Sequence, residues 1–225
     1  MSDAGADDAA SGSGSGAGAD VRVADAARPG EEQEDGIVLF LGTSLTAGYG
    51  VGEDLAYPAL VQEKIDSAGL PFRVVNAGLS GETSAGGLRR LDWSLQQPIE
   101  VLVLELGAND GLRGLAVDAM RANLDSILTR TSRRYPDAGL VVLGMEAPPN
   151  LGPSYTREFR EVYRDVAERH DAALVPFLLD SVAARPEMNL EDRIHPNPAG
   201  HRILARTVWR TLEAVLERHA SARTR

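Results

Sequence analysis

The sequence predicts an α/β fold in which helices cover both faces of a parallel sheet, and two observations support this prediction. The first is a run of five apolar residues, Ile37 to Leu41, bounded by Gly36 and Gly42, which suits a strand buried on both faces. The second is the alternation of such runs with helix-length segments along the rest of the chain, which is typical of a parallel sheet with helical connections.

The other elements are expected in the same alternating order. Residues 57–65 are predicted to form an amphipathic helix, because Leu60, Val61 and Ile65 fall on one side and Pro58 suits the first turn. The last expected helix carries an apolar stripe that ends at Leu216. Further strands are expected at residues 72–77, 99–106, 138–145 and 172–175, and further helices near residues 84–96, 116–133, 154–169 and 198–217.

The chain of 225 residues suits one globular domain with an appendage. Its charged residues are unevenly distributed between the two. Residues 1–35 hold nine acidic residues and two arginines, so that residues 36–225 keep only −3 of the chain's net charge of −10. Residues 2–20 contain only Ser, Asp, Ala and Gly. We therefore expect a disordered acidic tail at residues 1–35, a folded domain at residues 36–218 and a C-terminal tail at residues 219–225.

Composition excludes several classes of function. A mildly acidic domain without a basic patch argues against nucleic-acid binding, and the lack of cysteine excludes disulfides, thiolate catalysis and cysteine-bound metals. Because no apolar run approaches 18 residues and no export leader is visible, we expect a cytoplasmic protein without a membrane span. A periplasmic or secreted protein is the alternative if Met1 replaces a removed export signal. The oligomeric state is left open.

Small or polar residues follow three strands in succession, at residues 42–44, 80–81 and 107–110. In a parallel sheet these turns share one edge, so their side chains can meet in one cleft. Ser44 is the candidate nucleophile there, although a serine at this place could instead cap a helix.

Asp192 and His195 lie three residues apart just before the last helix. They would supply the orienting carboxylate and the base of a Ser/His/Asp arrangement with Ser44. An oxyanion formed by attack on an ester needs hydrogen-bond donors. The backbone N–H groups of Ser44 and Gly81 and the side-chain amide of Asn109 are the candidates.

Structural roles compete with several of these assignments. Asn109 could stabilise a turn, Asp110 could cap the following helix, and His195 could be a structural histidine. His201 is expected at the surface or as a helix cap. A metal site formed by Asp192, His195 and His201 would lack a standard ligand spacing, so no metal is predicted.

Other charged or glycine-rich features are assigned no role in the chemistry. His170 and His219 are expected in solvent, and Arg89 and Arg90 at the surface. The glycine-rich residues 42–52 lack the patterns of phosphate and dinucleotide loops, so no nucleotide or other cofactor is expected.

Four blocks of sequence resemble the SGNH (GDSL-like) hydrolases in order and spacing: residues 42–45, Gly81, residues 107–110 and residues 192–197. The fuller match of residues 80–84 and 107–114 is similar to the branch that contains bacterial arylesterases and acyl-CoA thioesterase I/lysophospholipase L1. The resemblance covers about residues 36–218. It implies a flavodoxin-like, three-layer α/β/α sandwich with a five-stranded parallel sheet.

The same resemblance implies roles for the candidate residues. Ser44 would be the nucleophile, Asp192 and His195 would complete the triad, and Gly81 and Asn109 would join the Ser44 amide as oxyanion donors. The family often has Asp where this chain has Thr43, so we expect altered local hydrogen bonding without loss of activity. The family also implies a mobile loop at residues 111–116 that closes on acyl chains, and its two glycines make such motion plausible.

We therefore predict a serine ester hydrolase that acts through an acyl-enzyme on short- to medium-chain esters. Alternatives are a thioesterase or lysophospholipase for longer chains, a carbohydrate acetyl esterase, which the scarcity of aromatic residues disfavours, and a binding module on a retired hydrolase fold. The substrate would be a small ester or thioester. The residues predicted to contact it are Thr43, Leu45, Asp110, Leu112, Arg113, Met145, Pro148 and Tyr155.

Overall fold

Five strands form a single parallel sheet in the computed structural model, which describes residues 35–223 of the chain. The strand order is β2-β1-β3-β4-β5, the order of flavodoxin-like folds, and it confirms the predicted five-stranded parallel sheet. All but the last residue of the predicted acidic tail lies outside the described residues. The strands are β1 (Gly36–Gly42), β2 (Phe72–Gly78), β3 (Val101–Glu105), β4 (Gly139–Leu143) and β5 (Ala173–Val175).

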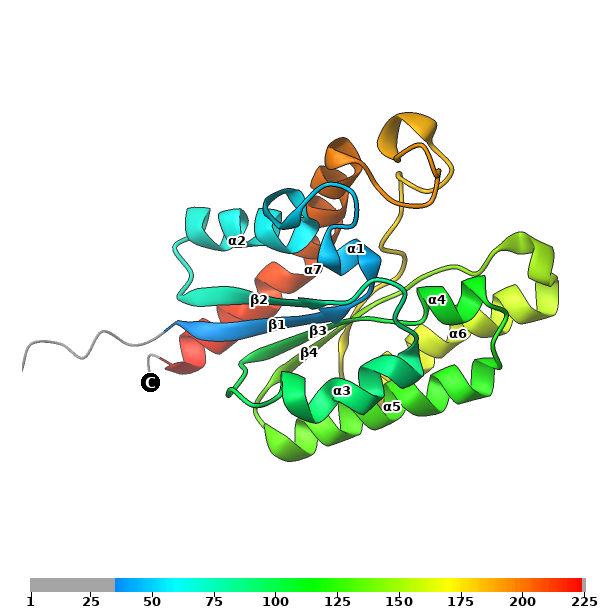
Figure 1. Ribbon diagram of the computed structural model, residues 1–225. Coiled ribbons are helices and arrows are strands. Elements are labelled where there is room, and N and C mark those ends of the chain that lie inside the picture. Colours follow the sequence, from blue (N-terminus) through cyan, green and yellow to red (C-terminus); the bar gives the residue numbers. More distant parts are fainter. Residues whose placement is uncertain (1–34, 224–225) are drawn as a thin grey trace, which may run out of the picture. The chain divides into compact units, whose positions relative to one another are not determined.

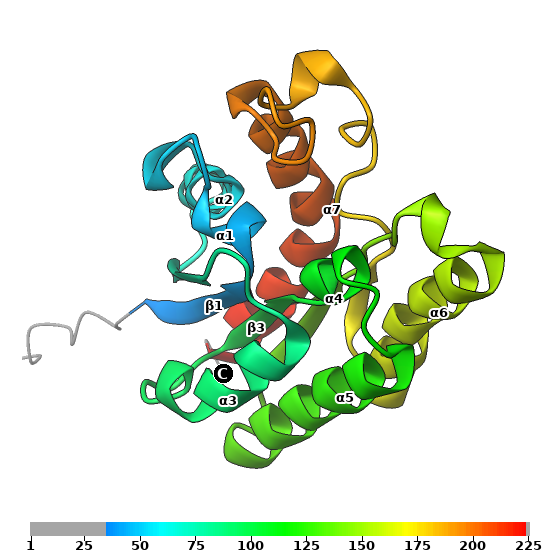
Figure 2. The ribbon, with the colours of Figure 1, turned by 45° about the vertical axis from the view of Figure 1, so that its right-hand side comes forward.

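Helices lie on both faces of this sheet and complete a three-layer α/β/α sandwich (Figures 1 and 2). Helices α2 and α7 pack together on one face, and α3, α5 and α6 pack in sequence on the other. None of the described helices is both long enough and apolar enough to cross a membrane. The helices are α1 (Ser44–Ala47), α2 (Tyr57–Ser67), α3 (Ser84–Ser94), α4 (Ala108–Leu112), α5 (Val117–Arg134), α6 (Pro153–Arg169) and α7 (Pro198–Arg223), with short 3₁₀ turns η1 (Glu53–Leu55), η2 (Pro149–Leu151) and η3 (Pro186–Met188).

The core is centred on β1 and β3, the two strands that lie side by side in the middle of the sheet. Every residue of both strands is buried, as expected for parallel strands with helices above and below. Phe40 on β1 is fully buried and meets the edge of the Tyr57 ring on α2, with ring centroids 5.7 Å apart. The turns that follow these central strands are therefore anchored in fully buried strands.

Helix α7 extends further than the sequence predicted. It continues to Arg223, so the described part of the expected tail at residues 219–225 is helical. Basic side chains in the last turns lie near Glu100, with His219 Nδ1 at 3.7 Å and Arg223 Nη1 at 3.8 Å from its carboxylate. Cations near a helix C-terminus are favourable for the helix dipole, and the Arg223 guanidinium also lies 5.8 Å from the Phe72 ring centroid.

His201 was expected at the surface or as a helix cap; the surface placement is wrong, and the side chain instead accepts from the first backbone N–H of α2. Its side chain lies between α7 and α2 with only 1% exposed, and its Nδ1 accepts a hydrogen bond of 3.1 Å from the backbone N–H of Tyr57. Burial lowers the pKa of His201 to about 4, and the nearby His195 adds to the effect. The residue is therefore neutral at physiological pH and joins the two helices.

His170 and His219, expected in solvent, are also largely covered, with 12% and 18% of their side chains exposed. His170 Nε2 lies 2.9 Å from the carboxylate of Asp125, and this hydrogen bond is the main reason that the pKa of Asp125 is lowered. Both histidines thus take part in contacts that tie helices and strand ends together. Sequence neighbours alone did not reveal these contacts, because the partner carboxylates are distant along the chain.

Candidate active site

The site forms at the carboxyl ends of β1 and β3, where the order of strand addition reverses. Strand β1 pairs with β2 on one side and β3 on the other, so Gly42 lies opposite both Gly78 and Glu105. Ligands of open α/β sheets bind in the crevice outside such a point. The three turns predicted to carry chemistry leave the sheet at this level, and their residues line one cleft.

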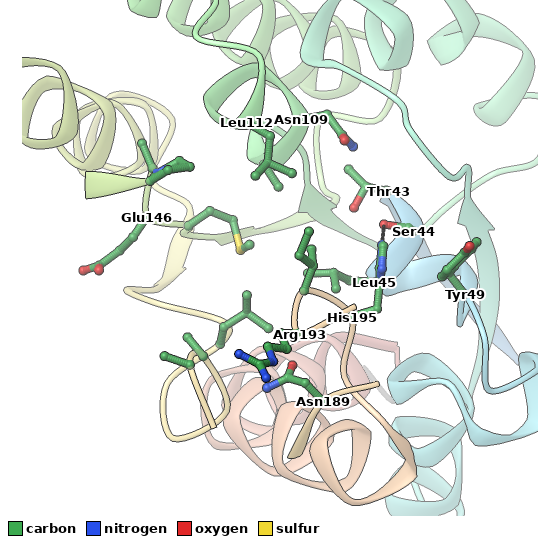
Figure 3. Close-up of a pocket in the computed structure, with 18 of the residues that line it drawn as sticks. Thr43, Ser44, Leu45, Tyr49, Asn109, Leu112, Glu146, Asn189, Arg193 and His195 are labelled. Atoms are coloured by element: carbon green, nitrogen blue, oxygen red, sulfur yellow. Dashed lines mark hydrogen bonds between the residues drawn. The ribbon is translucent and has the colours of Figure 1, made fainter. Parts of the chain in front are cut away.

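Ser44, His195 and Asp192 are brought into a hydrogen-bonded chain. Ser44 is the first residue of α1, and its Oγ lies 3.0 Å from His195 Nε2. His195 Nδ1 lies 2.7 Å from Asp192 Oδ2. In Figure 3 the His195 ring points at Ser44, and Asn109 lies on the other side of the serine. Residues 151 positions apart along the chain therefore meet as a hydroxyl and an imidazole.

Asp192 keeps its negative charge because the backbone of its own loop stabilises it. Its Oδ1 accepts hydrogen bonds from the backbone N–H groups of His195, at 3.0 Å, and Ile194, at 2.9 Å. These bonds, together with the His195 side chain, lower the pKa of Asp192 to about 2. A charged carboxylate holds the proton on His195 Nδ1, which leaves Nε2 free to accept the hydroxyl proton of Ser44.

The three candidate oxyanion donors face the same cleft. Ser44, Gly81 and Asn109 all line it, and among the described residues no hydrogen bond occupies the backbone N–H of Ser44 or Gly81. Gly81 has a φ of 77°, a left-handed conformation that favours glycine. The Asn109 amide donates one hydrogen bond of 3.0 Å to the carbonyl of Glu82, which leaves its second N–H for an oxyanion.

Three polar side chains hold the loop that carries Gly81. Arg90 forms an ion pair with the buried Glu82 and donates a 2.7 Å hydrogen bond to the Ala77 carbonyl at the end of β2. Arg113 donates a 2.8 Å hydrogen bond to the carbonyl of Gly81 itself. Arg90 was expected at the surface, but only 19% of its side chain is exposed. The sequence around Arg90 gave no sign of this structural role, because its partners Glu82 and Ala77 lie outside its own helix.

Asp110 does not line the cleft but supports two of the turns that form it. It is buried, and its carboxylate accepts hydrogen bonds from the backbone N–H and the hydroxyl of Ser84, at 2.8 and 2.6 Å. The bond ties α4, which carries Asn109, to the start of α3. Asp110 therefore connects the two turns that carry the candidate oxyanion donors Gly81 and Asn109.

A cleft of about 770 Å³ extends from Ser44. Of the residues predicted to contact substrate, Asp110, Arg113 and Tyr155 are not among its lining, and the Tyr155 hydroxyl instead donates to the Leu115 carbonyl at 2.7 Å. The predicted residues that do line it are Thr43, Leu45, Leu112, Met145 and Pro148.

Sequence reasoning missed several residues of this cleft. Phe177 and Leu179 reach it from the segment after β5, and Tyr49 covers the imidazole of His195, with ring centroids 4.5 Å apart. The isolated apolar residues of a long loop carry no periodic signal that could have identified them. Within residues 35–223, no group of three His, Asp or Glu side chains is placed to hold a metal ion.

Comparisons with known proteins find similar sequences among ester hydrolases. The model of the GDSL-like lipase/acylhydrolase family matches residues 40–203. The chain is 41% identical to the esterase TesA of Pseudomonas aeruginosa over 180 residues, which are 80% of this chain and 89% of that protein. It is 39% identical over 162 residues to the thioesterase 1/protease 1/lysophospholipase L1 of Escherichia coli K12, covering 71% of this chain and 75% of that protein.

Solved structures share the fold as well. The psychrotrophic esterase EstA from Pseudoalteromonas sp., in a form inhibited by monoethylphosphonate, aligns with a TM-score of 0.75 and 33% identity. The alignment covers 81% of this chain and all of that one.

Replacing Asp192 with Asn should lower kcat/KM by roughly 10³- to 10⁴-fold, because an amide no longer favours the His195 tautomer that accepts the serine proton. Initial rates with p-nitrophenyl butyrate measure the loss. Asp180→Asn, an exposed change in the preceding segment, is the control and should keep the wild-type rate. A tenfold or smaller effect of Asp192→Asn would contradict the assigned role.

Removing the amide of Asn109 by Asn109→Ala should lower kcat by roughly 10²- to 10³-fold with little change in KM, since the donor acts on charge that develops in the transition state. Asn123→Ala is a matched control, because its amide donates to the Ser84 hydroxyl at 2.9 Å outside the cleft. Steady-state kinetics of both variants distinguish an oxyanion-donor role of Asn109 from a purely structural one. Equal losses would mean that Asn109 acts only by holding the turn.

Proposed function

Since the chain belongs to the GDSL-like lipase/acylhydrolase family of ester hydrolases, we propose that it cleaves carboxylic esters through an acyl-enzyme on Ser44. The observation that carries this proposal is the chain of hydrogen bonds from Asp192 to His195, at 2.7 Å, and from His195 to Ser44, at 3.0 Å, at the edge of an apolar cleft. No step of the proposed mechanism requires a cofactor or metal.

In the first half of the reaction, His195 Nε2 takes the proton of the Ser44 hydroxyl as Oγ attacks the carbonyl carbon of the ester. The carbonyl oxygen becomes an oxyanion and receives hydrogen bonds from the Ser44 and Gly81 N–H groups and the Asn109 amide. The tetrahedral intermediate collapses, and His195 gives its proton to the departing alcohol. The acyl group is left as an ester on Ser44.

In the second half, water replaces the alcohol. His195 takes a proton from the water as its oxygen attacks the acyl-enzyme, and the same donors stabilise the second oxyanion. Collapse returns the proton to Ser44 and releases the carboxylic acid. Asp192 stays charged throughout, since its pKa is about 2, and stabilises the imidazolium in both halves.

The shape and lining of the cleft support short- to medium-chain acyl groups as the substrate. A volume of about 770 Å³ exceeds what an acetyl group needs, and side chains such as Leu112, Met145 and Phe177 make much of the wall apolar. Clefts of this size accommodate ligands well beyond a few atoms. The apolar wall would stabilise each added methylene of a chain that follows it.

A thioesterase or lysophospholipase for longer chains is the second candidate. It is favoured by the same apolar wall and by the name of the Escherichia coli relative. The two candidates share the chemistry at Ser44 and differ in acyl length and leaving group. Rates with acyl-CoA thioesters and with p-nitrophenyl esters of matched chain length separate them.

Ser44→Ala should abolish turnover of p-nitrophenyl esters from acetate to palmitate, because among the described residues no other cleft hydroxyl is hydrogen-bonded to His195. Ser80→Ala removes a different hydroxyl from the cleft lining and should remain active. A serine-directed phosphonate should label the wild-type peptide that contains Ser44. Label on Ser80 would contradict the assignment of Ser44, and a wild type without turnover would favour a binding module.

Filling the outer cleft should shorten the preferred acyl chain. Ala183 lines the cleft and is exposed, so Ala183→Trp should reduce kcat/KM for decanoate and longer esters while acetate hydrolysis is retained. Ala214→Trp on the exposed side of α7 is the matched control with an unchanged profile. If both variants keep the wild-type chain-length profile, acyl chains do not follow this wall.

A further inference from the structure

A buried carboxylate lies directly beneath the proposed nucleophile. Glu105, the last residue of β3, has no exposed surface, although acidic side chains are almost never fully buried unless they are paired. Within residues 35–223 no Lys, Arg or His forms an ion pair with it. The mechanism described above does not use this group.

Glu105 receives its hydrogen bonds from the two threonines that flank Ser44. The backbone N–H of Thr43 donates to Oε2 at 2.8 Å, and the Thr43 hydroxyl lies 2.9 and 3.0 Å from the two carboxylate oxygens. The Thr46 hydroxyl donates to Oε2 at 2.8 Å. One carboxylate therefore holds the residue before the nucleophile and the residue two positions after it.

The helix that carries Ser44 cannot hold itself in place. Helix α1 has four residues, and the Thr43 side chain does not cap it. A single isolated turn is unstable in water because nucleation is unfavourable. Its orientation, and with it the direction of the Ser44 hydroxyl and N–H, must come from contacts with the rest of the domain.

We propose that Glu105 is a positioning residue that orients Ser44 toward His195 and toward the oxyanion site through its hydrogen bonds to Thr43 and Thr46. Glu105 lies on the strand that leads directly to Asn109, so the same strand end fixes the nucleophile and one oxyanion donor. This inference rests on the proposed role of Ser44.

The residue type at position 43 fits this role. A threonine offers the carboxylate two donors, its N–H and its hydroxyl. An aspartate there would place a second carboxylate against Glu105, and two such groups cannot both ionise at contact distance. Thr43 therefore lets Glu105 act as an acceptor alone.

The hydrogen bonds of Glu105 continue away from the cleft. The Thr46 hydroxyl lies 2.8 Å from the Tyr57 hydroxyl, and the Tyr57 N–H donates to the buried His201. Helices α1, α2 and α7 are thereby joined through one polar network to β3. The network anchors the nucleophile turn to the core rather than to other surface loops.

Three single variants and one double variant test the proposal. Glu105→Leu removes every acceptor and should lower kcat by about 100-fold or more per active site, with KM changed little. Thr43→Val removes the hydroxyl that contacts both carboxylate oxygens and should lower kcat by roughly tenfold, since the loss of a buried hydrogen bond leaves its acceptor partly unsatisfied. Glu105→Gln keeps one acceptor oxygen, and the threonine hydroxyls can turn to meet its amide, so it should restore most of the activity lost in Glu105→Leu.

The controls separate positioning from folding. Titration with a serine-directed phosphonate gives the concentration of active sites, and kcat is expressed per site. Thr131→Val removes a buried hydroxyl that donates to the Ile127 carbonyl at 2.9 Å within α5 and should leave kcat unchanged. If Glu105→Leu does not fold, Thr43→Val and Glu105→Gln still test the proposal.

The double variant Thr43→Val/Glu105→Leu should lose no more activity than Glu105→Leu alone, because the hydroxyl then has no carboxylate to bind. Multiplicative losses, or a wild-type kcat per site in Glu105→Leu or Thr43→Val, would overturn the positioning role. If instead Ser44 is not the nucleophile, the result is different, because the wild type itself would show no phosphonate label on Ser44.

Discussion

The constraint on which the site depends is the parallel register of β1 between β2 and β3. Gly42 lies opposite Gly78 and Glu105, so the turns after the three strands begin at the same level. A slip by one residue would turn every side chain to the other face. Contact between α1 and β2 adds to this constraint, because a Cβ on Gly78 would lie 2.2 Å from the backbone nitrogen of Ala47. The register and this glycine together bring Ser44 close to the loop of Gly81.

His195 is not placed by the sheet, and its loop has its own internal support. The Leu190 N–H donates to the His195 carbonyl at 2.8 Å. Asn189 lies at the start of the same loop and donates to two carbonyls of the preceding segment, at 2.7 and 2.8 Å. Asn197 then caps α7 by accepting from the backbone N–H groups of Ala199 and Gly200. Arg193, between the two catalytic candidates, has a left-handed φ of 60°, a conformation that such a residue keeps only where its surroundings determine it.

The sequence was sufficient for the sheet and for the four blocks, since both are local patterns. Apolar runs such as residues 37–41 indicate burial on both faces. Three of the four blocks follow strands, and the fourth precedes α7. Glu105 was not recognised, because a charge at the end of an apolar run does not reveal that its donors lie 62 residues earlier. Helices α1 and α4 have four and five residues, too few for a periodic pattern. The polar contacts of Arg90 and His201 were missed because their partners lie on other elements.

Two carboxylates near Ser44 have pKa values shifted in opposite directions, and the shifts follow from their surroundings. Hydrogen bonds in an exposed loop lower the pKa of Asp192 to about 2, whereas burial raises that of Glu105 to about 7 against the opposing bonds from Thr43 and Thr46. By linkage, Asp192 stabilises the fold above its unfolded pKa, and this contribution is lost as pH falls toward 2. For Glu105 the change of folding stability with pH has the opposite sign. The folded state binds its proton more tightly than the unfolded state, so its contribution to stability declines as pH rises from about 4.5 to about 7. Glu105 therefore contributes less to folding stability at neutral pH than at pH 4.5. Its presence is better explained by the orientation that it gives the turn of Ser44.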